Sequence, residues 1–549
     1  MAKRLTTFSK LLITLLILAL IFFGFTWLKN NTGLGDLVND GGTTRTEQTS
    51  GNTKTSGDKT TIMGKNSNGS KNSNAARNNS GASDDDNTLK VQLVSWGGYA
   101  PGLYFNEGAE ANLKSRFYKD YGFKVDFKLE NDLLNAMDAW LADEYDIIVQ
   151  TADAFPLYTA PDEINAVDPR AFMQVDWSRG GDAIIVKRGI NTVNDLKGKT
   201  IAVAVPSPAQ TLLITSLEAA GLSYNDVKVI KTTDNLKAAE LFRTNDVDAA
   251  VVWSPDDIIA TRDVAGSKIL LNTESQTHVI ADIMMAKQGT IDAKREMFNK
   301  FYEGWMKGVA ELNNPANQDK AAKYLAELNG VSKDDALGMM SVVKWTTHGD
   351  NVNFFGLNPQ YKGQQGKDLY TKMATNFVKT GDAEKVAPSW RSVIYTGAVQ
   401  NASKLSGSGY KAEKSKVFKP TTAKDKTVTP IASKPVSINF DSGKYQLTAN
   451  AKTIIDLQFA DVAKAFAGTK VRIEGNTDNV GSLQSNVSLS QRRAQSVASY
   501  LQSQYKMDAN RFVIIGNGPN KPTAGCESNA SAQCKAANRR TDFQLIPAN

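Results

Sequence analysis

Strand-like and helix-like segments alternate between residues 89 and 286, and this alternation limits the possible fold more than any other feature of the sequence. Short runs rich in β-branched residues predict strands, and apolar residues three or four positions apart predict helices. Alternation of this kind is typical of an α/β domain with a parallel sheet. The predicted strands are Leu89–Ser95, Lys124–Leu129, Tyr145–Gln150, Asp182–Lys187, Thr200–Val205, Val227–Lys231, Asp248–Trp253 and His278–Ala286, and the predicted helices include Asn106–Tyr118, Leu133–Leu141, Ala209–Ala220 and one that ends at Leu241.

The last of these strands follows a second set of strands and helices, so the chain visits a second α/β unit and then returns to the first. This layout is typical of a hinged two-lobe binding protein. We expect the two-lobe domain to span residues 89–400, with its second lobe at about 182–275. The two crossings near 176–183 and 274–280 would form the hinge.

Three motifs in this region resemble periplasmic substrate-binding proteins of the nitrate, sulfonate and taurine type. They are Trp96-Gly97-Gly98-Tyr99-Ala100 after the first strand, the run from Asp195 to Ala202, and the run from Asp248 to Pro255. The middle run also occurs in other two-lobe binding proteins, so it indicates the fold and not the ligand. The resemblance implies a domain that binds a small solute, as the binding component of an ABC-type importer does.

Polar and aromatic residues follow the carboxyl ends of the predicted strands, where ligands bind in open α/β sheets. Ser207 stands where a helix begins, so free backbone N–H groups and the helix dipole can receive an oxyanion there. Aromatic rings suit an apolar or amine-bearing part of the solute. A core role for the two tryptophans and a surface role for the hinge arginine remain equally open. The candidate solute-binding residues are Trp96, Gly97, Tyr99, Asp153, Arg179, Ser207, Ala209 and Trp253.

Near the end of the chain an apolar strand runs into a polar turn that carries Asp478, and a helix with Arg492 and Arg493 follows. An acid and a base held apart in one shallow site suit a zwitterion with an amine and a carboxylate. A purely local interpretation also remains, in which Asp478 caps the turn and the two arginines form a solvated helix face.

These residues resemble the OmpA-like peptidoglycan-binding domain. Its pattern is Gly-x-Thr-Asp, then Asn-x-x-Leu-Ser-x-x-Arg-Ala, then Asn-Arg-Arg, and the chain has all three at Gly475–Asp478, Asn486–Ala494 and Asn538–Arg540. The resemblance implies that Asp478 holds the amine of diaminopimelate in the cell-wall stem peptide and that Arg493 holds its carboxylate. It also implies that Thr477, Asn486 and Arg540 line the same pocket, within a domain at residues 435–549.

The chain has only two cysteines, Cys526 and Cys534, both in this C-terminal domain. They are too few for a disulfide-rich scaffold and form a poor zinc site. Some OmpA-like domains carry a disulfide-closed loop just before the Asn-Arg-Arg segment, so the resemblance implies a disulfide and an oxidising compartment. Two free thiols in a reducing cytosol are the alternative.

Residues 11–28 form an uncharged apolar run that follows Lys3, Arg4 and Lys10. As a helix this run would be about 27 Å long, close to the thickness of a bilayer core. We expect a transmembrane anchor at residues 1–29, because the run is longer than a usual signal peptide core and no Ala-x-Ala site follows it. The positive charges place the bulk of the chain outside the inner membrane, in the periplasm. Release into the periplasm after signal cleavage is the alternative.

Two segments of low complexity are expected to be linkers. Residues 30–88 consist mainly of Asn, Gly, Ser, Thr and Lys, so they cannot bury enough apolar surface to fold. This composition predicts a disordered tether. Residues 401–434 are rich in lysine and predict a second, solvated linker. The formal charge of +7 is small for 549 residues, and the lysine-rich stretch contains few aromatic residues. Both observations argue against a nucleic-acid partner.

No motif in the sequence indicates catalysis. The only histidines, His278 and His348, lack metal-ligand spacing, and neither a Gly-x-Ser-x-Gly elbow nor a P-loop is present. We therefore expect a non-catalytic envelope protein without cofactor or metal, which binds a small solute and grips peptidoglycan. The alternatives are a component of an ABC-type importer, with a permease partner, for a small oxyanion, sulfonate or amine compound, and a purely structural tether between membrane and wall.

Overall fold

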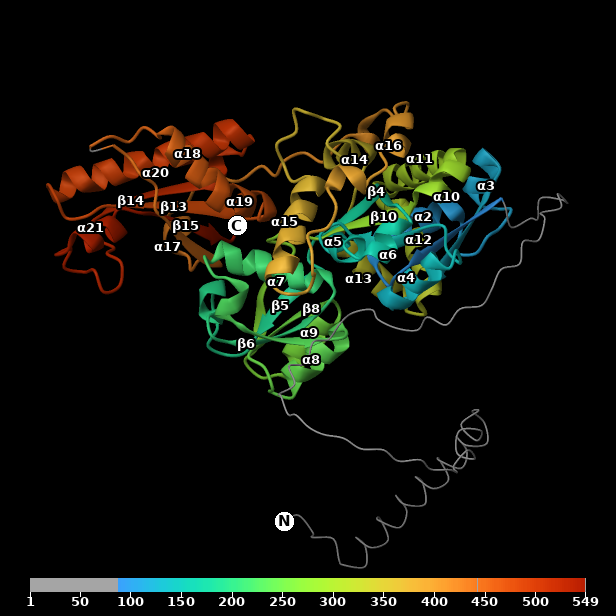
Figure 1. Cartoon of the computed structure of the whole chain (residues 1–549), viewed down its shortest axis with the longest axis horizontal. Coiled ribbons are helices and arrows are strands. Elements are labelled where there is room, and N and C mark those ends of the chain that lie inside the picture. The colour runs from blue at the N-terminus through green and yellow to red at the C-terminus, as the bar shows by residue number, and fades with distance from the viewer. Residues whose placement is uncertain (1–86, 442, 549) are drawn as a thin grey trace, which may run out of the picture. The chain divides into compact units, whose positions relative to one another are not determined.

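The computed structural model describes residues 87–441 and 443–548 (Figure 1). The expected anchor at residues 1–29, and the expected tether up to residue 86, lie outside the described residues. Among the helices that are described, none combines the length and the apolar character that a membrane crossing requires.

The first lobe is built on a four-stranded sheet in the order β11-β4-β10-β3, with the parallel pair β1-β2 beside it. Helices from two distant stretches of chain surround these sheets, and their apolar side chains form one continuous core. The strands are β1 (Thr88–Leu93), β2 (Lys124–Leu129), β3 (Ile148–Thr151), β4 (Pro169–Ser178), β10 (Ala281–Lys287) and β11 (Val343–Trp345). The helices are α2 (Ala100–Asn106), α3 (Arg116–Tyr121), α4 (Leu133–Leu141), α5 (Phe155–Thr159), α6 (Asp162–Ala166), α10 (Gln288–Ala293), α11 (Arg295–Leu312), α12 (Pro315–Asn329), α13 (Lys333–Ser341), α14 (His348–Phe354), α15 (Gly366–Lys379) and α16 (Gly397–Asn401).

Two expectations for this lobe are wrong. The helix predicted at Asn106–Tyr118 is absent, because α2 ends where Glu107 adopts the left-handed conformation and the chain stays irregular until α3. The sheet is also not parallel, since β10 pairs antiparallel with both β3 and β4, and β11 pairs antiparallel with β4. The strand β4 escapes prediction because nine of its ten residues are buried, so it lacks the alternation of a half-exposed strand.

The second lobe is a five-stranded mixed sheet in the order β7-β6-β8-β5-β9 (Figure 1). The strand β6 is parallel to β7 and β8, as expected, whereas β5 runs antiparallel to β8 and β9. Its strands are β5 (Asp182–Val186), β6 (Thr200–Ala204), β7 (Lys228–Thr232), β8 (Ala249–Trp253) and β9 (Lys268–Asn272), and its helices are α7 (Pro208–Ala219), α8 (Asn235–Arg243) and α9 (Asp256–Asp263).

The chain crosses between the lobes twice, from β4 to β5 and from β9 to β10. The two crossings are bonded to each other, since the Thr273 hydroxyl oxygen accepts a hydrogen bond from the Gly180 amide at 2.8 Å and lies 2.8 Å from the Ser178 hydroxyl. Gly180 has a φ of +123°, which a side chain rarely tolerates. The crossings therefore form a narrow, glycine-containing strip that connects two separate sheets.

The C-terminal domain is a four-stranded sheet in the order β12-β15-β13-β14, and the long helix α20 lies along it (Figure 1). This helix approaches closely because the strands present glycine to it: a Cβ on Gly475 would lie 2.2 Å from the Ser490 carbonyl oxygen. The strands are β12 (Ala432–Val436), β13 (Lys470–Asn476), β14 (Phe512–Gly518) and β15 (Thr541–Ile546). The helices are α17 (Ala423–Thr427), α18 (Ala449–Ile455), α19 (Asp461–Ala465), α20 (Leu483–Tyr505) and α21 (Ala532–Asn538), with a π-helical turn, Asp456–Ala460, between α18 and α19.

The C-terminal domain packs on the second lobe. Their apolar residues form one cluster, and Asn194 exchanges two hydrogen bonds of 2.9 Å with the backbone of Ser433. The crossing between β9 and β10 also contacts this domain, since the His278 amide donates to the Ala465 carbonyl at 3.3 Å. Within the segment expected as a linker, Asp425 is buried against Lys470 at 2.9 Å. A movement of the second lobe would therefore carry the C-terminal domain with it.

Candidate functional site

Two aspartates face each other where the crossing strands of the first lobe meet. Asp176 of β4 and Asp282 of β10 are directly paired across the ladder, and both side chains are buried. A third aspartate, Asp182, begins β5 on the other side of the first crossing and is also buried. We call these three residues the cleft floor, because they lie at the hinge between the two sheets.

The hydrogen-bond partners of the cleft floor are neutral. The Tyr99 hydroxyl donates to Asp282 Oδ2 at 2.7 Å, and the Trp96 indole donates to Asp176 Oδ2 at 3.2 Å. The Ser178 hydroxyl donates to Asp182 Oδ2 at 2.7 Å. Two of the expected solute residues, Trp96 and Tyr99, are therefore oriented by carboxyl groups that the sequence analysis did not single out.

Burial makes it costly to ionise the cleft floor. It raises the pKa of Asp282 to about 7 and the pKa of Asp182 to about 6. It also raises the pKa of Asp176 well above its ordinary range, with repulsion from Asp282 as the next cause. The pKa values of these carboxyl groups are therefore raised toward or above neutrality, which makes the cleft floor a functional-site candidate.

Asp153, another expected solute residue, follows β3 and reaches the second lobe. It is fully buried, and neither of its carboxyl oxygens has a hydrogen-bond partner. Burial raises its pKa to about 7, and the Thr211 hydroxyl and Asp182 are close enough to influence it. Thr211 lies on α7 of the second lobe, and its buried hydroxyl is also without a hydrogen-bond partner. The two lobes thus meet around unsatisfied polar groups.

Ser207, expected at a helix end that could receive an oxyanion, is already hydrogen-bonded within the second lobe. Ser207 caps α7: its hydroxyl donates to the Ala204 carbonyl at 2.8 Å and accepts from the Ala209 amide at 3.2 Å. The first N–H group of this helix is therefore already used within the chain. Trp253 ends β8 and is half-buried, while Gly97 lies in a 3₁₀ turn packed against the Met339 carbonyl.

A polar contact at the side of the cleft also joins the lobes. Asp382, which follows α15 of the first lobe, accepts a hydrogen bond from the Gln210 amide at 2.6 Å and pairs with Lys231. The side chain of Asp382 is only 2% exposed in this contact. No local pattern in the sequence marks this residue, because its partners come from a distant lobe.

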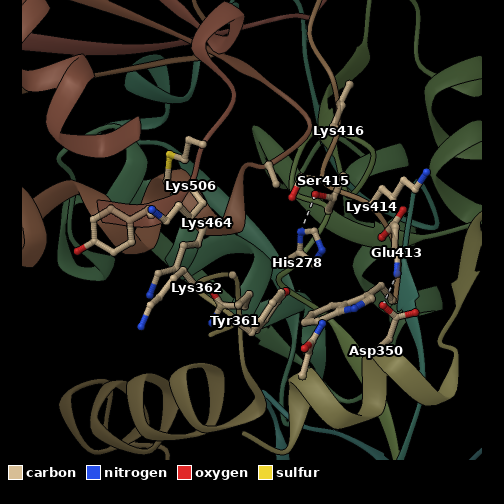
Figure 2. Close-up of a pocket in the computed structure, with 18 of the residues that line it drawn as sticks. His278, Asp350, Tyr361, Lys362, Glu413, Lys414, Ser415, Lys416, Lys464 and Lys506 are labelled. Carbon is tan, nitrogen blue, oxygen red and sulfur yellow. Dashed lines mark hydrogen bonds between the residues drawn. The ribbon is translucent and has the colours of Figure 1, made fainter. Parts of the chain in front are cut away.

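Arg179, also expected near the solute, lines a cavity of about 710 Å³ between the first lobe, the second crossing and the C-terminal domain. Figure 2 shows this cavity with His278 and Glu413 in its wall. The Arg179 guanidinium pairs with Glu413 at 2.8 Å and donates to the Thr277 carbonyl at 2.9 Å. His278 lies beside it, and burial lowers the pKa of this histidine well below its ordinary range. The cavity is lined by more basic than acidic side chains, the basic ones being Arg179, Lys362, Lys414, Lys416, Lys464, Lys506 and Arg511.

The turn after β13 holds the acidic half of the second candidate site. Asp478 Oδ1 accepts from the Val480 amide at 3.2 Å, which matches a local turn-capping role. Its other oxygen, Oδ2, accepts from Arg539 Nη1 at 2.7 Å. Arg539 is the middle residue of the late Asn-Arg-Arg motif, whereas the resemblance to OmpA-like domains implies a place in this pocket for its neighbour Arg540.

Arg493 supplies the basic half from α20. Its Nε donates to the Lys444 carbonyl at 3.0 Å, and its guanidinium lies over the Phe440 ring at 4.8 Å. Burial lowers the pKa of Arg493, whereas the nearby Asp478 carboxylate raises it. The structure therefore brings Asp478, Arg493 and Arg539 together without a direct bond between the first two.

The remaining expected residues support the turn or the strand edge. Asn486 donates to the Val480 carbonyl at 3.0 Å, and Thr477 donates to the Asp478 carbonyl at 2.8 Å. Arg540 donates to Asp542 at 3.0 Å, at the start of β15. Asn486 and Thr477 thus hold the shape of the Asp478 turn from both ends.

The implied disulfide between Cys526 and Cys534 is confirmed by the structure. It ties the loop that precedes α21 to the first turn of this helix, which contains Cys534, and Asn538 at the end of the helix donates to the Cys526 carbonyl at 3.0 Å. Arg539 follows Asn538, so α21 connects the disulfide to one of the site arginines.

Replacing both cysteines with serine is expected to lower the free energy of unfolding of the C-terminal domain by about 2–3 kcal/mol, from the loop entropy of so short a ring. Thermal unfolding of the full chain, compared with the double serine variant, measures this loss. A variant with unchanged unfolding would contradict it.

Two separate parts of the chain match known protein families. Residues 112–318 match the NMT1/THI5 like family, and residues 439–536 match the OmpA family. The chain joins an NMT1/THI5-like domain to an OmpA domain. The cleft floor belongs to the NMT1/THI5-like domain, and the site at Asp478 belongs to the OmpA domain.

Individual relatives cover only parts of the chain. A probable lipoprotein of Escherichia coli K12, YiaD, is 41% identical over 118 residues, which are 21% of this chain and 51% of that protein. The peptidoglycan-associated lipoprotein of Haemophilus influenzae is 35% identical over 86 residues, which are 16% of this chain and 55% of that protein. These two matches thus span about half the length of each of these two relatives. The solved structure of the periplasmic aliphatic sulphonate binding protein SsuA from Escherichia coli covers 56% of this chain and 92% of its own, with 16% identity and a TM-score of 0.43.

Proposed function

We propose that this chain is a non-catalytic protein of the cell envelope that binds peptidoglycan through its OmpA domain and a small solute through its NMT1/THI5-like domain. The observation that carries the proposal is the grouping of Asp478 with Arg493 and Arg539 at the turn after β13. An acid and two guanidinium groups at one turn suit a ligand that has both an amine and a carboxylate.

At the wall site, the ammonium group of diaminopimelate would bind the Asp478 carboxylate, and its carboxylate would bind Arg493. Arg539 has to leave Asp478 for this to happen, and the two can separate readily because the Arg539 side chain is 49% exposed. Arg539 is then free to add a second contact to the ligand carboxylate. The similarity of this domain to a peptidoglycan-associated lipoprotein supports the assignment.

In the solute domain, the second lobe would rotate about the two crossings and open the contact between Asp153 and Thr211. The solute would enter at the cleft floor, and closure would bury it between Trp96, Tyr99 and the start of α7. The second lobe and the OmpA domain share one apolar core, so the two would move together against the first lobe.

The expected anchor at residues 1–29 would hold the chain in the inner membrane, with both binding domains in the periplasm. The disulfide between Cys526 and Cys534 supports an oxidising compartment. Delivery of the solute to an ABC permease is the second candidate function, favoured by the two-lobe domain itself. A purely structural tether would need only the anchor and the wall site.

The test uses the full chain, purified in detergent, with insoluble diaminopimelate-type peptidoglycan. The chain is expected to sediment with the wall, and free meso-diaminopimelate is expected to release it, because the amino acid presents the same amine and carboxylate. Cadaverine, which has the same two amines but no carboxylate, is the matched competitor and should release much less. Failure to sediment, or equal release by both compounds, would contradict the proposed wall site.

A further inference from the structure

Four buried carboxyl groups of the NMT1/THI5-like domain lie around the crossings between the lobes, and among the described residues none of them has a cationic hydrogen-bond partner. The groups are Asp153, Asp176, Asp182 and Asp282. In the described part of the chain, their hydrogen-bond partners are the neutral side chains of Trp96, Tyr99 and Ser178, and Asp153 has none. Buried carboxyl groups are normally paired or fully hydrogen-bonded, so this arrangement requires an explanation.

We infer that the solute of this domain is a small organic cation with N–H donors, an alkylammonium or guanidinium compound, and not an oxyanion. The inference rests on the solute-binding function proposed above, and it gives the chemical class of that solute. A cation with N–H groups would supply the positive charge that balances these carboxyl groups. Its N–H groups would also donate hydrogen bonds to the oxygens of Asp153 and Thr211, which have no hydrogen-bond partner among the described residues.

The unsatisfied groups point to donors on the solute. Both oxygens of Asp153 are acceptors when ionised, and the Thr211 hydroxyl on the opposite lobe accepts as well. The indole of Trp96 and the ring of Tyr99 are held beside the same floor by Asp176 and Asp282. Aromatic faces next to carboxylates are a favourable environment for an ammonium or guanidinium group.

An oxyanion would meet repulsion at this floor. The helix end that could receive it, the start of α7, already satisfies its first amide through Ser207. A bound metal ion is also disfavoured, because no three acidic, histidine or cysteine side chains of the described residues converge as metal ligands. An extended organic cation can contact carboxyl groups that are too far apart for one metal ion.

The direction of the pH dependence separates the two classes of solute. A cation prefers ionised carboxyl groups, so it binds with release of protons and its affinity rises through the pKa of about 7 of Asp153 and Asp282. An anion prefers the protonated groups, and its affinity falls over the same range. The other titratable groups facing this site are Asp176, Asp182, Asp257 and Tyr99. Burial raises the pKa of the three aspartates, so they shift the dependence in the same direction, whereas Tyr99 stays neutral over this range because burial raises its pKa well above its ordinary value of 10.0.

The experiment titrates the full chain with putrescine and methylguanidine as cation probes, and with ethanesulfonate and nitrate as anion probes, at pH 6 and pH 8. Binding is followed by tryptophan fluorescence, because Trp96 lies at the floor, and by the shift in melting temperature. At least one cation is expected to bind, about tenfold more tightly at pH 8 than at pH 6 for each proton released.

The variant Asp153→Asn is expected to weaken the cation at least tenfold and to reduce its pH dependence, whereas Asp138→Asn, on the exposed face of α4, is expected to change neither. If Asp153→Asn does not fold, Asp282→Asn replaces it, with the same expectation. Binding of an anion with no binding of either cation would overturn the inference but leave the solute-binding function intact. No response to any of the four probes would contradict the solute-binding function itself, and the inference with it.

Discussion

The substitution Asp478→Asn is expected to reduce the affinity of the full chain for diaminopimelate-type peptidoglycan about thirtyfold. The change keeps the size of the side chain but removes the charge that would hold the ligand ammonium group, and a hydrogen bond to a charged group contributes about 2 kcal/mol. The amide oxygen of the new asparagine can still accept from the Val480 amide, so the turn should keep its shape. Sedimentation with purified cell wall over a range of protein concentrations measures the affinity.

The matched pair of arginines on α20 provides the control. Arg493 lies over Phe440 and close to Asp478, whereas Arg492 lies over Tyr445 at 5.0 Å on the exposed helix face. Arg493→Ala is expected to lose wall binding as Asp478→Asn does, and Arg492→Ala is expected to keep it. Equal loss in both arginine variants would mean that the helix contributes only general positive charge. Full wall binding by Asp478→Asn would contradict the location of the wall site at this turn.

The substitution Asp153→Asn is expected to stabilise the solute domain, and the gain should grow with pH. The pKa of Asp153 is raised by burial from its ordinary value of 3.8 to about 7, so the folded protein holds this proton more tightly than the unfolded chain does. Stability is therefore lost as pH rises from about 4 to about 7, and the loss is complete above 7. It amounts to about 4 kcal/mol at most, and asparagine avoids it because it cannot ionise.

Calorimetric melting of the full chain at pH 5 and pH 8 measures this effect. At pH 5 part of the penalty is already present, so the gain at pH 8 is expected to exceed the gain at pH 5 by about 2.5 kcal/mol, or about 4 °C in melting temperature for a domain of this size. The exposed variant Asp138→Asn should melt like the parent at both values. A gain that is the same at both pH values, or a loss at pH 8, would show that Asp153 does not ionise at a cost in the folded protein.

Local patterns in the sequence predict much of the secondary structure. Leu133–Leu141 and Lys124–Leu129 form the expected helix and strand with the expected ends, because their apolar spacing matches one type of element only. The helix wrongly predicted at Asn106–Tyr118 and the unpredicted strand β4 are places where the apolar spacing does not indicate the element. A left-handed residue ends the first, and burial on both faces hides the period of the second.

The two sites differ in how far the sequence predicts them. Asp478, Thr477 and Asn486 act within one turn and the helix after it, so their contacts follow from short sequence distances. Arg539 enters the same site from the far side of a disulfide loop, and its ion pair with Asp478 depends on how β15 is placed beside β13. The motif indicates that arginines are present there, but not which of them reaches the carboxylate.

The sequence by itself determined the strand-turn-helix at Asp478 and the cysteine pair of the disulfide, since each depends on residues close together in the chain, and the alternation of strands and helices predicted the two-lobe layout. Only the tertiary structure decided the character of the cleft. Asp176 and Asp282 become neighbours through the antiparallel register of β4 and β10, and Asp153 meets Thr211 only where two lobes touch. Burial then changes what these carboxyl groups do, because the cost of ionisation depends on the surrounding dielectric and partners, which no single segment of the chain contains.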